Sequence, residues 1–173
     1  MSEFPVPVLG IVAWSGTGKT SLLERLIPEL RDNGIRVAAI KHSHHDFEID
    51  KQGKDSDKLR KAGAGQIILT SKYRTALIIE EDRETEPDLF QQLSRLDAEK
   101  LDLVLVEGFR QVDIPKIEVY RPSLEKPMLC LQDRNIVALA CDEQPQQDVA
   151  IEVLPLNDER AVSAFVTKWI NSL

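Results

Sequence analysis

The stretch AWSGTGKT, residues 13–20, decides the fold of this 173-residue chain. Its spacing is that of a phosphate-binding P-loop (Walker A): Ala or Gly, four variable residues, then Gly-Lys and Ser or Thr. Ala13 stands where the strict form has Gly. An apolar run, residues 6–14, leads into the loop, and an amphipathic stretch, residues 17–33, leaves it. This order of strand, loop and helix favours phosphate binding over a chance glycine-rich turn.

The residue types of the loop explain how it would hold a triphosphate. Gly16 and Gly18 permit close approach and unusual backbone angles, so that consecutive N–H groups converge on phosphate oxygens at the helix start. Lys19 would reach the β- and γ-phosphates, and the Thr20 hydroxyl would ligate Mg²⁺. The predicted phosphate site comprises Ser15, Gly16, Thr17, Gly18, Lys19, Thr20 and Ser21.

The rest of the chain alternates β-rich runs with amphipathic stretches. Strands are expected at residues 6–14, 35–42, 66–71, 75–80, 101–106, 116–120, 136–141 and 150–154. Helices are expected at residues 17–33, with a kink or break at Pro28, and at 55–62, 89–96 and a final stretch capped by Asn157. This alternation predicts one α/β domain over residues 1–173, with a mixed, mostly parallel sheet and helices on both faces.

Residues 66–80 read as an inserted β-hairpin, because a polar turn around Lys72-Tyr73-Arg74 joins two β runs. The edges of such a hairpin can pair across chains, so we expect it to serve in homodimerisation.

Glu107 ends the apolar run LDLVLV, and Gly108 follows it. Carboxyl ends of parallel strands form the edge at which ligands bind, so Glu107 is the candidate Walker B-like carboxylate. It would polarise the attacking water or hold a Mg²⁺-bound water, unless it merely enters a loop. Glu107 and Lys19 are the predicted catalytic residues, and Thr20 and Glu107 the predicted metal ligands.

All three histidines fall in the segment KHSHHD, residues 41–46, directly after the second strand. Three interpretations stay open: a divalent metal site, an anion site for a second phosphate-bearing ligand, and an exposed polar loop. Lys41, His42 and Asp46 are the candidate ligand-binding residues there. Asp142 follows another strand end and is a candidate to accept hydrogen bonds from a guanine edge, although a surface turn explains it equally well.

Composition excludes several classes of protein. The net charge of −7 disfavours non-specific nucleic-acid binding, and no apolar run approaches the ~20 residues of a membrane span. The N-terminus lacks the pattern of a signal peptide. Cys130 and Cys141 lie in or beside apolar runs without metal-type spacing, which indicates buried thiols in a cytoplasmic protein.

Three motifs in order, AWSGTGKTSLLERLIP, IKHSHHDFEIDKQGKDSDKLRKAGA and LDLVLVEGF, closely resemble those of the MobB family, the molybdopterin-guanine dinucleotide biosynthesis adapter proteins. The resemblance implies a dimeric, GTP-binding protein with weak GTPase activity that assists the guanylyltransferase MobA, with molybdopterin or a molybdoenzyme as further partners. It places the family's motifs on residues 15–20, on Lys41, His42, His44, His45 and Asp46, and on Glu107 and Gly108.

Two other functions compete with a slow GTP-binding adapter. A P-loop small-molecule or nucleotide kinase would need an arginine-rich lid, yet the arginines are scattered, at 60, 74, 83, 95, 110 and 121. Of these, Arg110 lies just beyond Glu107 as a candidate arginine finger. The third possibility is a metal-delivery or sensing module that uses the histidines.

Overall fold

The computed structural model describes residues 4–43, 47, 49, 51–81, 83 and 85–173. The chain divides into two compact units, one formed by Met1–His42 with Asp88–Leu173 and the other by Ser43–Pro87. All the predicted nucleotide-binding residues except Asp46 belong to the first unit, and the hairpin belongs to the second. Asp46 lies outside the described residues, as do His44 and His45.

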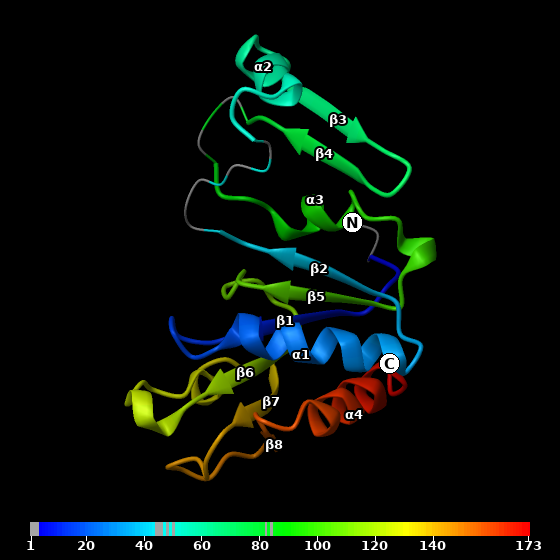
Figure 1. Cartoon of the computed structure of the whole chain (residues 1–173). Helices are drawn as coiled ribbons and strands as arrows, with labels where there is room; N and C mark the ends of the chain where they lie inside the picture. Colours follow the sequence, from blue (N-terminus) through cyan, green and yellow to red (C-terminus); the bar gives the residue numbers. More distant parts are fainter. Residues whose placement is uncertain (1–3, 44–46, 48, 50, 82, 84) are drawn as a thin grey trace. The chain divides into compact units, whose positions relative to one another are not determined.

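The first unit is built on a parallel sheet in the order β2-β5-β1-β6-β7-β8 (Figure 1). Every pairing in this sheet is parallel. Its strands are β1 (Val8–Val12), β2 (Val37–Lys41), β5 (Leu103–Glu107), β6 (Lys116–Tyr120), β7 (Ile136–Cys141) and β8 (Glu152–Pro155). The predicted α/β fold with a mostly parallel sheet, of the P-loop NTPase type, is confirmed. The antiparallel pairing that was expected within this sheet is instead confined to a separate two-stranded sheet, β3-β4.

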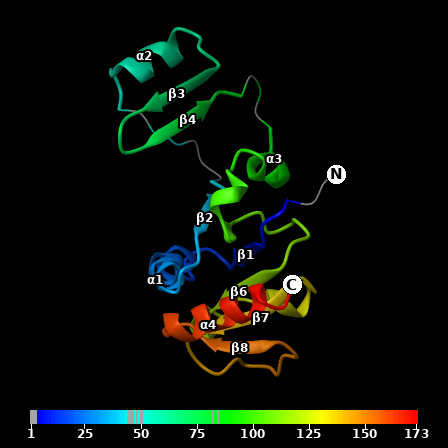
Figure 2. The same ribbon diagram turned by 90° about the vertical axis from the view of Figure 1, so that its right-hand side faces the viewer.

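Helices cover both faces of this sheet. Helices α1 (Lys19–Asp32) and α4 (Glu159–Ile170) lie on one face, and the short helix α3 (Leu89–Leu93) lies on the other (Figure 2). Short 3₁₀ turns complete the unit at η1 (Ala98–Lys100), η2 (Pro122–Leu124) and η3 (Leu129–Leu131).

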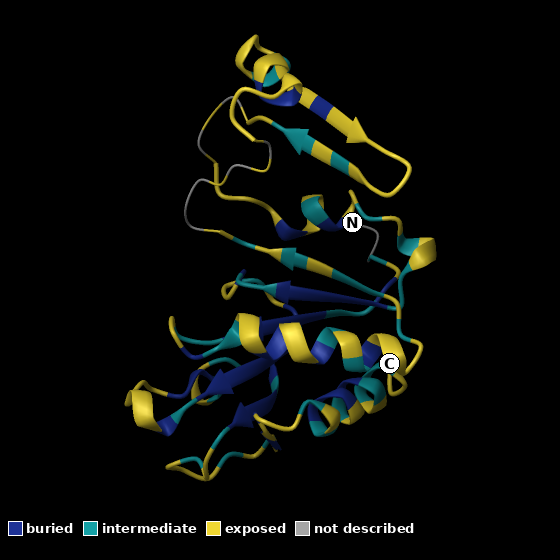
Figure 3. Ribbon diagram, viewed as in Figure 1, coloured by how far each residue is buried: buried dark blue, intermediate teal, exposed yellow. Residues whose placement is uncertain are grey.

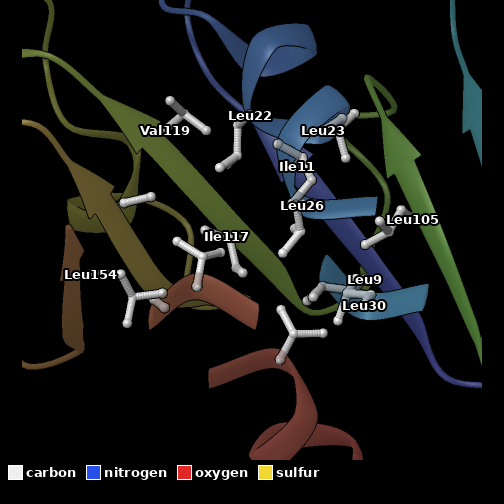
Figure 4. Close-up of a cluster of buried hydrophobic side chains, with 14 of the residues drawn as sticks. Leu9, Ile11, Leu22, Leu23, Leu26, Leu30, Leu105, Ile117, Val119 and Leu154 are labelled. Carbon is white, nitrogen blue, oxygen red and sulfur yellow. The ribbon is translucent and has the colours of Figure 1, made fainter. Parts of the chain in front are cut away.

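The main core joins α1 and α4 to the central strands. The buried stripe of α1 consists of Leu22, Leu23, Leu26 and Leu30, at helical spacing (Figure 4). It packs against Leu9 and Ile11 of β1, Leu105 of β5 and Ile117 of β6. Complete burial of aliphatic side chains contributes about 1.5–3 kcal/mol each, so this stripe fixes the helix that begins at the P-loop.

The predicted N-cap of α4 is wrong, and of the kink or break predicted at Pro28 the break does not occur. Helix α1 continues through Pro28. Pro28 and Glu24, whose carbonyl would have accepted the missing N–H, both lie on the exposed side of the helix, where that carbonyl is open to solvent. The N-cap of α4 is Asp158 rather than Asn157, and its carboxylate accepts from the N–H groups of Arg160 and Ala161.

The apolar run at residues 35–42 predicts a buried strand, but strand β2 is not buried. It ends the strand order, so it has a single neighbour, and its residues are half-buried or exposed (Figure 3). Strands β1 and β5, from the apolar runs at residues 6–14 and 101–106, are mostly buried. The strand predicted at residues 116–120 was expected to alternate between buried and exposed residues, but all five residues of β6 are buried. Lys41 therefore lies at the accessible rim of the sheet.

The second unit contains helix α2 (Asp55–Lys61) and the antiparallel pair β3 (Gln66–Thr70) and β4 (Thr75–Ile79). Ile67 is buried, whereas its neighbour Ile68 and the cross-strand partner Leu77 are 68% and 45% exposed. The predicted hairpin is thus confirmed, and one of its faces carries exposed apolar side chains.

Candidate functional site

The P-loop occupies residues 13–18, between the end of β1 and the start of α1. Gly16 has φ 79° and Gly18 has φ 101°, so both adopt left-handed backbone conformations that other residues rarely take. Gly18 is the N-cap of α1, and no side chain caps this end of the helix. The glycines of the motif therefore perform the conformational role expected of them.

The start of α1 presents unused hydrogen-bond donors. Within the described part of the chain, the N–H groups of Gly18, Lys19, Thr20 and Ser21 donate no hydrogen bond. The side chains of Thr20 and Ser21 are exposed, so this end of the helix is open to solvent. Because the helix dipole adds positive potential here, the arrangement suits a phosphate group.

Lys19 and Thr17 fold back on the loop. The Lys19 ammonium lies 3.5 Å from the Ala13 carbonyl oxygen and 3.4 Å from that of Trp14. The Thr17 hydroxyl donates to the Trp14 carbonyl at 2.6 Å, and Thr17 is only 2% exposed. These long lysine contacts with neutral carbonyls are weak, whereas a phosphate would give the ammonium a charged acceptor.

Glu107 lies between two predicted ligand-binding residues. The Thr20 hydroxyl is 3.2 and 3.3 Å from its two carboxylate oxygens, and the Lys41 ammonium is 3.3 Å from Oε1. Strand register explains this, because Lys41 of β2 and Ile11 of β1 both pair with Glu107 of β5. The Glu107 side chain is 12% exposed, whereas that of Lys41 is 59% exposed. A hydroxyl and a carboxylate placed together provide the oxygen ligands that Mg²⁺ prefers.

Gly108 allows the chain to turn after β5, with φ 93°. A Cβ atom at this position would lie 2.8 Å from the Cβ of His42, too close for any other residue. His42 also donates its backbone N–H to the Glu107 carbonyl, and its ring lies 4.8 Å from that of Phe109. Gly108 therefore allows both the turn after β5 and the close packing of His42 against it.

Asp142 is connected to the P-loop through Arg121, which no sequence motif singled out. Asp142 follows β7 and forms an ion pair with Arg121, which follows β6. Arg121 Nε also donates to the Thr17 carbonyl of the P-loop at 2.9 Å. The pairing of Tyr120 with Cys141 places the next residue of each strand side by side. This apposition of Arg121 and Asp142 follows from the strand register, which an isolated arginine in the sequence does not reveal.

Arg110, the candidate arginine finger, lies with its guanidinium carbon 4.7 Å from the centre of the Trp14 ring. Trp14 in turn donates its indole N–H to the Pro127 carbonyl at 2.8 Å. Cation–π contacts at exposed positions contribute about 0.5–1 kcal/mol. In the described structure Arg110 thus packs on the P-loop tryptophan.

A separate hollow of about 550 Å³ lies around Lys116 and Asp133, away from the N–H groups of the P-loop. Lys116 is 1% exposed, and its ammonium lies 2.8 Å from Asp133. The Lys116 stem crosses β1 at Gly10, where a Cβ atom would lie 2.9 Å from Lys116 Cγ. Asn135 donates its backbone N–H to Asp133 and its side-chain amide N–H to Asp113. The polar groups satisfy one another, so we regard this hollow as a structural network.

Metal binding by cysteine finds no support in the geometry. Among the described residues, no group of three or more His, Cys, Asp or Glu side chains is arranged to hold a metal ion. Burial raises the pKa of the Cys130 thiol to about 12, with the Glu118 carboxylate adding to the effect. Burial likewise raises the pKa of Cys141. Cys141 is buried as predicted, whereas Cys130 is half-buried, and their raised pKa values favour the protonated thiol at both positions.

Known proteins with similar sequences are molybdopterin-guanine dinucleotide proteins. A family profile described as "MobB: Molybdopterin guanine dinucleotide synthesis protein B" matches residues 8–142. The molybdopterin-guanine dinucleotide biosynthesis adapter protein of Escherichia coli (strain K12) is 48% identical over 166 residues, covering 95% of this chain and 94% of the relative. The adapter protein of Haemophilus influenzae is 40% identical over 166 residues, covering 96% of this chain and 90% of the relative.

Solved structures agree with these sequence matches. A crystal structure of molybdopterin-guanine biosynthesis protein B aligns with a TM-score of 0.72 and 27% identity, over 94% of this chain and 99% of that one. The MobB homologue of Bacillus stearothermophilus aligns with a TM-score of 0.68 and 23% identity, over 96% of this chain and 99% of that one. At this identity the match supports the fold alone.

Proposed function

Since this chain belongs to the MobB family, we propose that it is a GTP-binding adapter of molybdopterin guanine dinucleotide biosynthesis, with Mg²⁺ and weak GTPase activity. Its proposed partners are a MobA-type guanylyltransferase and, beyond it, molybdopterin or a molybdoenzyme. The observation that carries the nucleotide part is the set of unused N–H groups at the start of α1, next to Lys19 and the Thr20–Glu107 pair.

The residues present fit a magnesium ion. The Thr20 hydroxyl and the Glu107 carboxylate lie within 3.3 Å of each other at the carboxyl edge of the sheet. When bound there, Mg²⁺ would neutralise charge on the β- and γ-phosphates. Thr20 would ligate the ion, and Glu107 would hold one of its waters or orient the attacking water. We expect the negative Glu107 to exchange its contact with Lys41 for these interactions.

Release of Lys41 suggests how the adapter could accept a second ligand. Its ammonium pairs only with Glu107 among the ion pairs of the described residues, and it lies at the exposed rim of the sheet. Once Glu107 is engaged with the metal, Lys41 is available to an anion. We therefore assign Lys41 and His42 to the contact with a phosphate-bearing partner ligand; Asp46, the third candidate, lies outside the described residues.

Slow turnover suits an adapter better than the alternative kinase function. The one arginine beside Glu107 in sequence, Arg110, packs on Trp14, and Arg121 is bonded to the loop backbone. Neither forms a mobile lid in the described structure. Steady-state assays with candidate phosphate acceptors separate the two functions, since acceptor-dependent release of ADP or GDP at ordinary enzyme rates would support a kinase.

Guanine selection is proposed for Asp142. Its Oδ2 atom binds Arg121, whereas Oδ1 is buried without a hydrogen-bond partner among the described residues. After a small side-chain rotation, Oδ1 would accept from guanine N1–H or the exocyclic amine. Adenine presents an acceptor at N1 and would be rejected, because an unmade bond to a charged group costs about 1.5–3 kcal/mol.

Asp142→Asn is therefore expected to lower the ratio of GTP affinity to ATP affinity by about tenfold or more. Isothermal titration of both nucleotides measures this ratio directly, and it is insensitive to losses that affect the two equally. Glu143→Gln, an exposed neighbour that loses the same charge, serves as the matched control. An unchanged ratio in Asp142→Asn would exclude Asp142 from base selection.

Homodimerisation is proposed to use the hairpin at residues 66–80. An isolated two-stranded sheet is marginally stable in water, and the exposed pair Ile68 and Leu77 is the kind of apolar surface that another chain covers. Light scattering is expected to give twice the single-chain mass of 19.5 kDa for the unmodified protein. The Ile68→Lys variant is expected to give a mass closer to that of a single chain. A monomeric mass for the unmodified protein at working concentration contradicts this.

Location in the cytoplasm is part of the same proposal. Each helix in the part of the chain that the structure describes is too short or too polar to cross a lipid bilayer. Retention of protein in the supernatant after fractionation of cells tests the proposed location.

A further inference from the structure

We propose that Arg121 is a positioning residue of the phosphate loop, which sets the direction of the Gly18 N–H by holding the Thr17 carbonyl. This inference deepens the proposed function and rests on it, because the P-loop must bind a triphosphate for the effect to matter. It assigns a role to a residue outside the P-loop, the Glu107 segment and the histidine-rich segment.

The contacts of Arg121 converge on one peptide group. Its Nε atom donates to the Thr17 carbonyl at 2.9 Å. Its Nη2 atom lies 3.7 Å from the point where a Cβ atom on Gly18 would be. Its Nη1 atom pairs with Asp142, so one planar guanidinium spans the loop and the end of β7. Arginine suits this position because its donors are held in a rigid fork.

Through the geometry of the peptide bond, the contact of Arg121 with the Thr17 carbonyl sets the direction of an N–H group in the phosphate site. A trans peptide is planar, so the carbonyl of one residue and the N–H of the next point in opposite directions. Fixing the Thr17 carbonyl towards Arg121 therefore directs the Gly18 N–H away from Arg121. That N–H is one of the unused donors at the start of α1.

Other contacts hold Thr17 and Arg121 in place. The Thr17 hydroxyl donates to the Trp14 carbonyl at 2.6 Å, and the residue is 2% exposed. The ion pair with Asp142 holds the guanidinium in place, so less rotamer freedom remains to be lost when it binds the loop. Gly18, with φ 101°, has little intrinsic preference that would keep its peptide in one orientation. The loop therefore depends on an outside contact for its preorganisation.

Because the contact acts on the loop backbone, it affects the binding of phosphate whatever base is attached. Arg121→Gln is expected to weaken the binding of inorganic triphosphate and ATP by one common factor, about tenfold, the order of one charge-assisted hydrogen bond, and the binding of GTP by at least that factor, since Asp142 also loses its partner. Arg121→Lys keeps a donor without the fork, so it should recover part of the loss. Isothermal titration in Mg²⁺ gives all three affinities.

The matched control is Arg25→Gln. Arg25 also donates from its guanidinium to a backbone carbonyl, that of Leu156 at 3.2 Å, but it does not touch the P-loop. This variant should retain wild-type affinity for all three ligands. Thermal unfolding of both variants shows whether lost binding merely follows lost stability.

A second measurement needs no ligand. In the ¹⁵N–¹H NMR spectrum of the free protein, the Gly18 amide signal should shift in Arg121→Gln and remain in place in Arg25→Gln. Unchanged triphosphate affinity in Arg121→Gln, or a loss confined to GTP, would overturn the inference. So would equal losses in both arginine variants. Failure of the unmodified protein to bind any triphosphate would contradict the proposed function instead, and the amide measurement would still test Arg121.

Discussion

Lys19→Ala is expected to lower GTP affinity by about 30- to 150-fold, equivalent to about 2–3 kcal/mol for charge-assisted bonds to phosphate. In the described structure the ammonium makes only long contacts with the Ala13 and Trp14 carbonyls, at 3.5 and 3.4 Å. Its removal therefore leaves no buried partner unsatisfied, and the fold should persist with little change in melting temperature. Isothermal titration and thermal unfolding measure the two effects.

Lys168→Ala, an exposed lysine in the last turn of α4, is the matched control for charge removal from a helix. It should bind GTP as the unmodified protein does. If Lys19→Ala also retains full affinity, the assignment of residues 13–20 as the triphosphate site is wrong. Loss of binding together with unfolding would instead mean that Lys19 stabilises the loop, contrary to its weak contacts.

Glu107→Gln is expected to reduce GTP hydrolysis about 100-fold or more, the range in which a positioned general base contributes. The glutamine preserves the size of the side chain and can still meet the Thr20 hydroxyl, now 3.2 Å from Oε1. It cannot accept a proton, and it loses the charge that attracts Lys41. Single-turnover hydrolysis measures the rate without interference from slow product release.

The same variant separates the two roles considered for Glu107. If Glu107 orients the attacking water, hydrolysis falls while the Mg²⁺ dependence of GTP binding is kept. If Glu107 instead holds a water bound to the metal, hydrolysis falls and GTP binding by the variant also requires a higher Mg²⁺ concentration. Asp102→Asn removes a carboxylate just before the same strand, at its opposite end, where Asp102 pairs with Arg36. That control should hydrolyse GTP normally, and an unaffected Glu107→Gln would exclude Glu107 from catalysis.

Local patterns in the sequence predicted the elements that build the site. The P-loop spacing located the start of α1, and the apolar run LDLVLV placed Glu107 at the end of β5. The apposition of Thr20, Lys41 and Glu107 followed from a single rule, that the carboxyl ends of parallel strands share one edge. These predictions depend only on which residues lie at strand ends.

Features that depend on neighbouring strands were not predictable in this way. The contact of Arg121 with Thr17 requires β6 to lie beside β1, and the order of strands in the sheet cannot be read from their order along the sequence. Lys116 was expected in an alternating strand, yet it is almost fully buried because Gly10 leaves room for its stem. The exposure of β2 likewise follows from its terminal place in the sheet.

The fold also explains how one edge of the sheet could serve an adapter. Glu107 lies between the start of α1 and Lys41, so the carboxylate that we propose for the metal site has a cation on its other side. Engagement of Glu107 by a bound nucleotide and metal would change the charge presented by Lys41 at the rim. The proposed adapter thus reports its nucleotide state through a local electrostatic change, without requiring rapid hydrolysis.

Competitive nucleotide binding with and without Mg²⁺ tests the central claim most directly. A fluorescent GTP analogue bound to the unmodified protein would be displaced by GTP, ATP and inorganic triphosphate in parallel titrations. We predict that Mg²⁺ tightens GTP binding and that GTP competes at least about tenfold better than ATP, through Asp142. Failure of GTP to bind in the presence of Mg²⁺, or binding indifferent to the metal, would contradict the account.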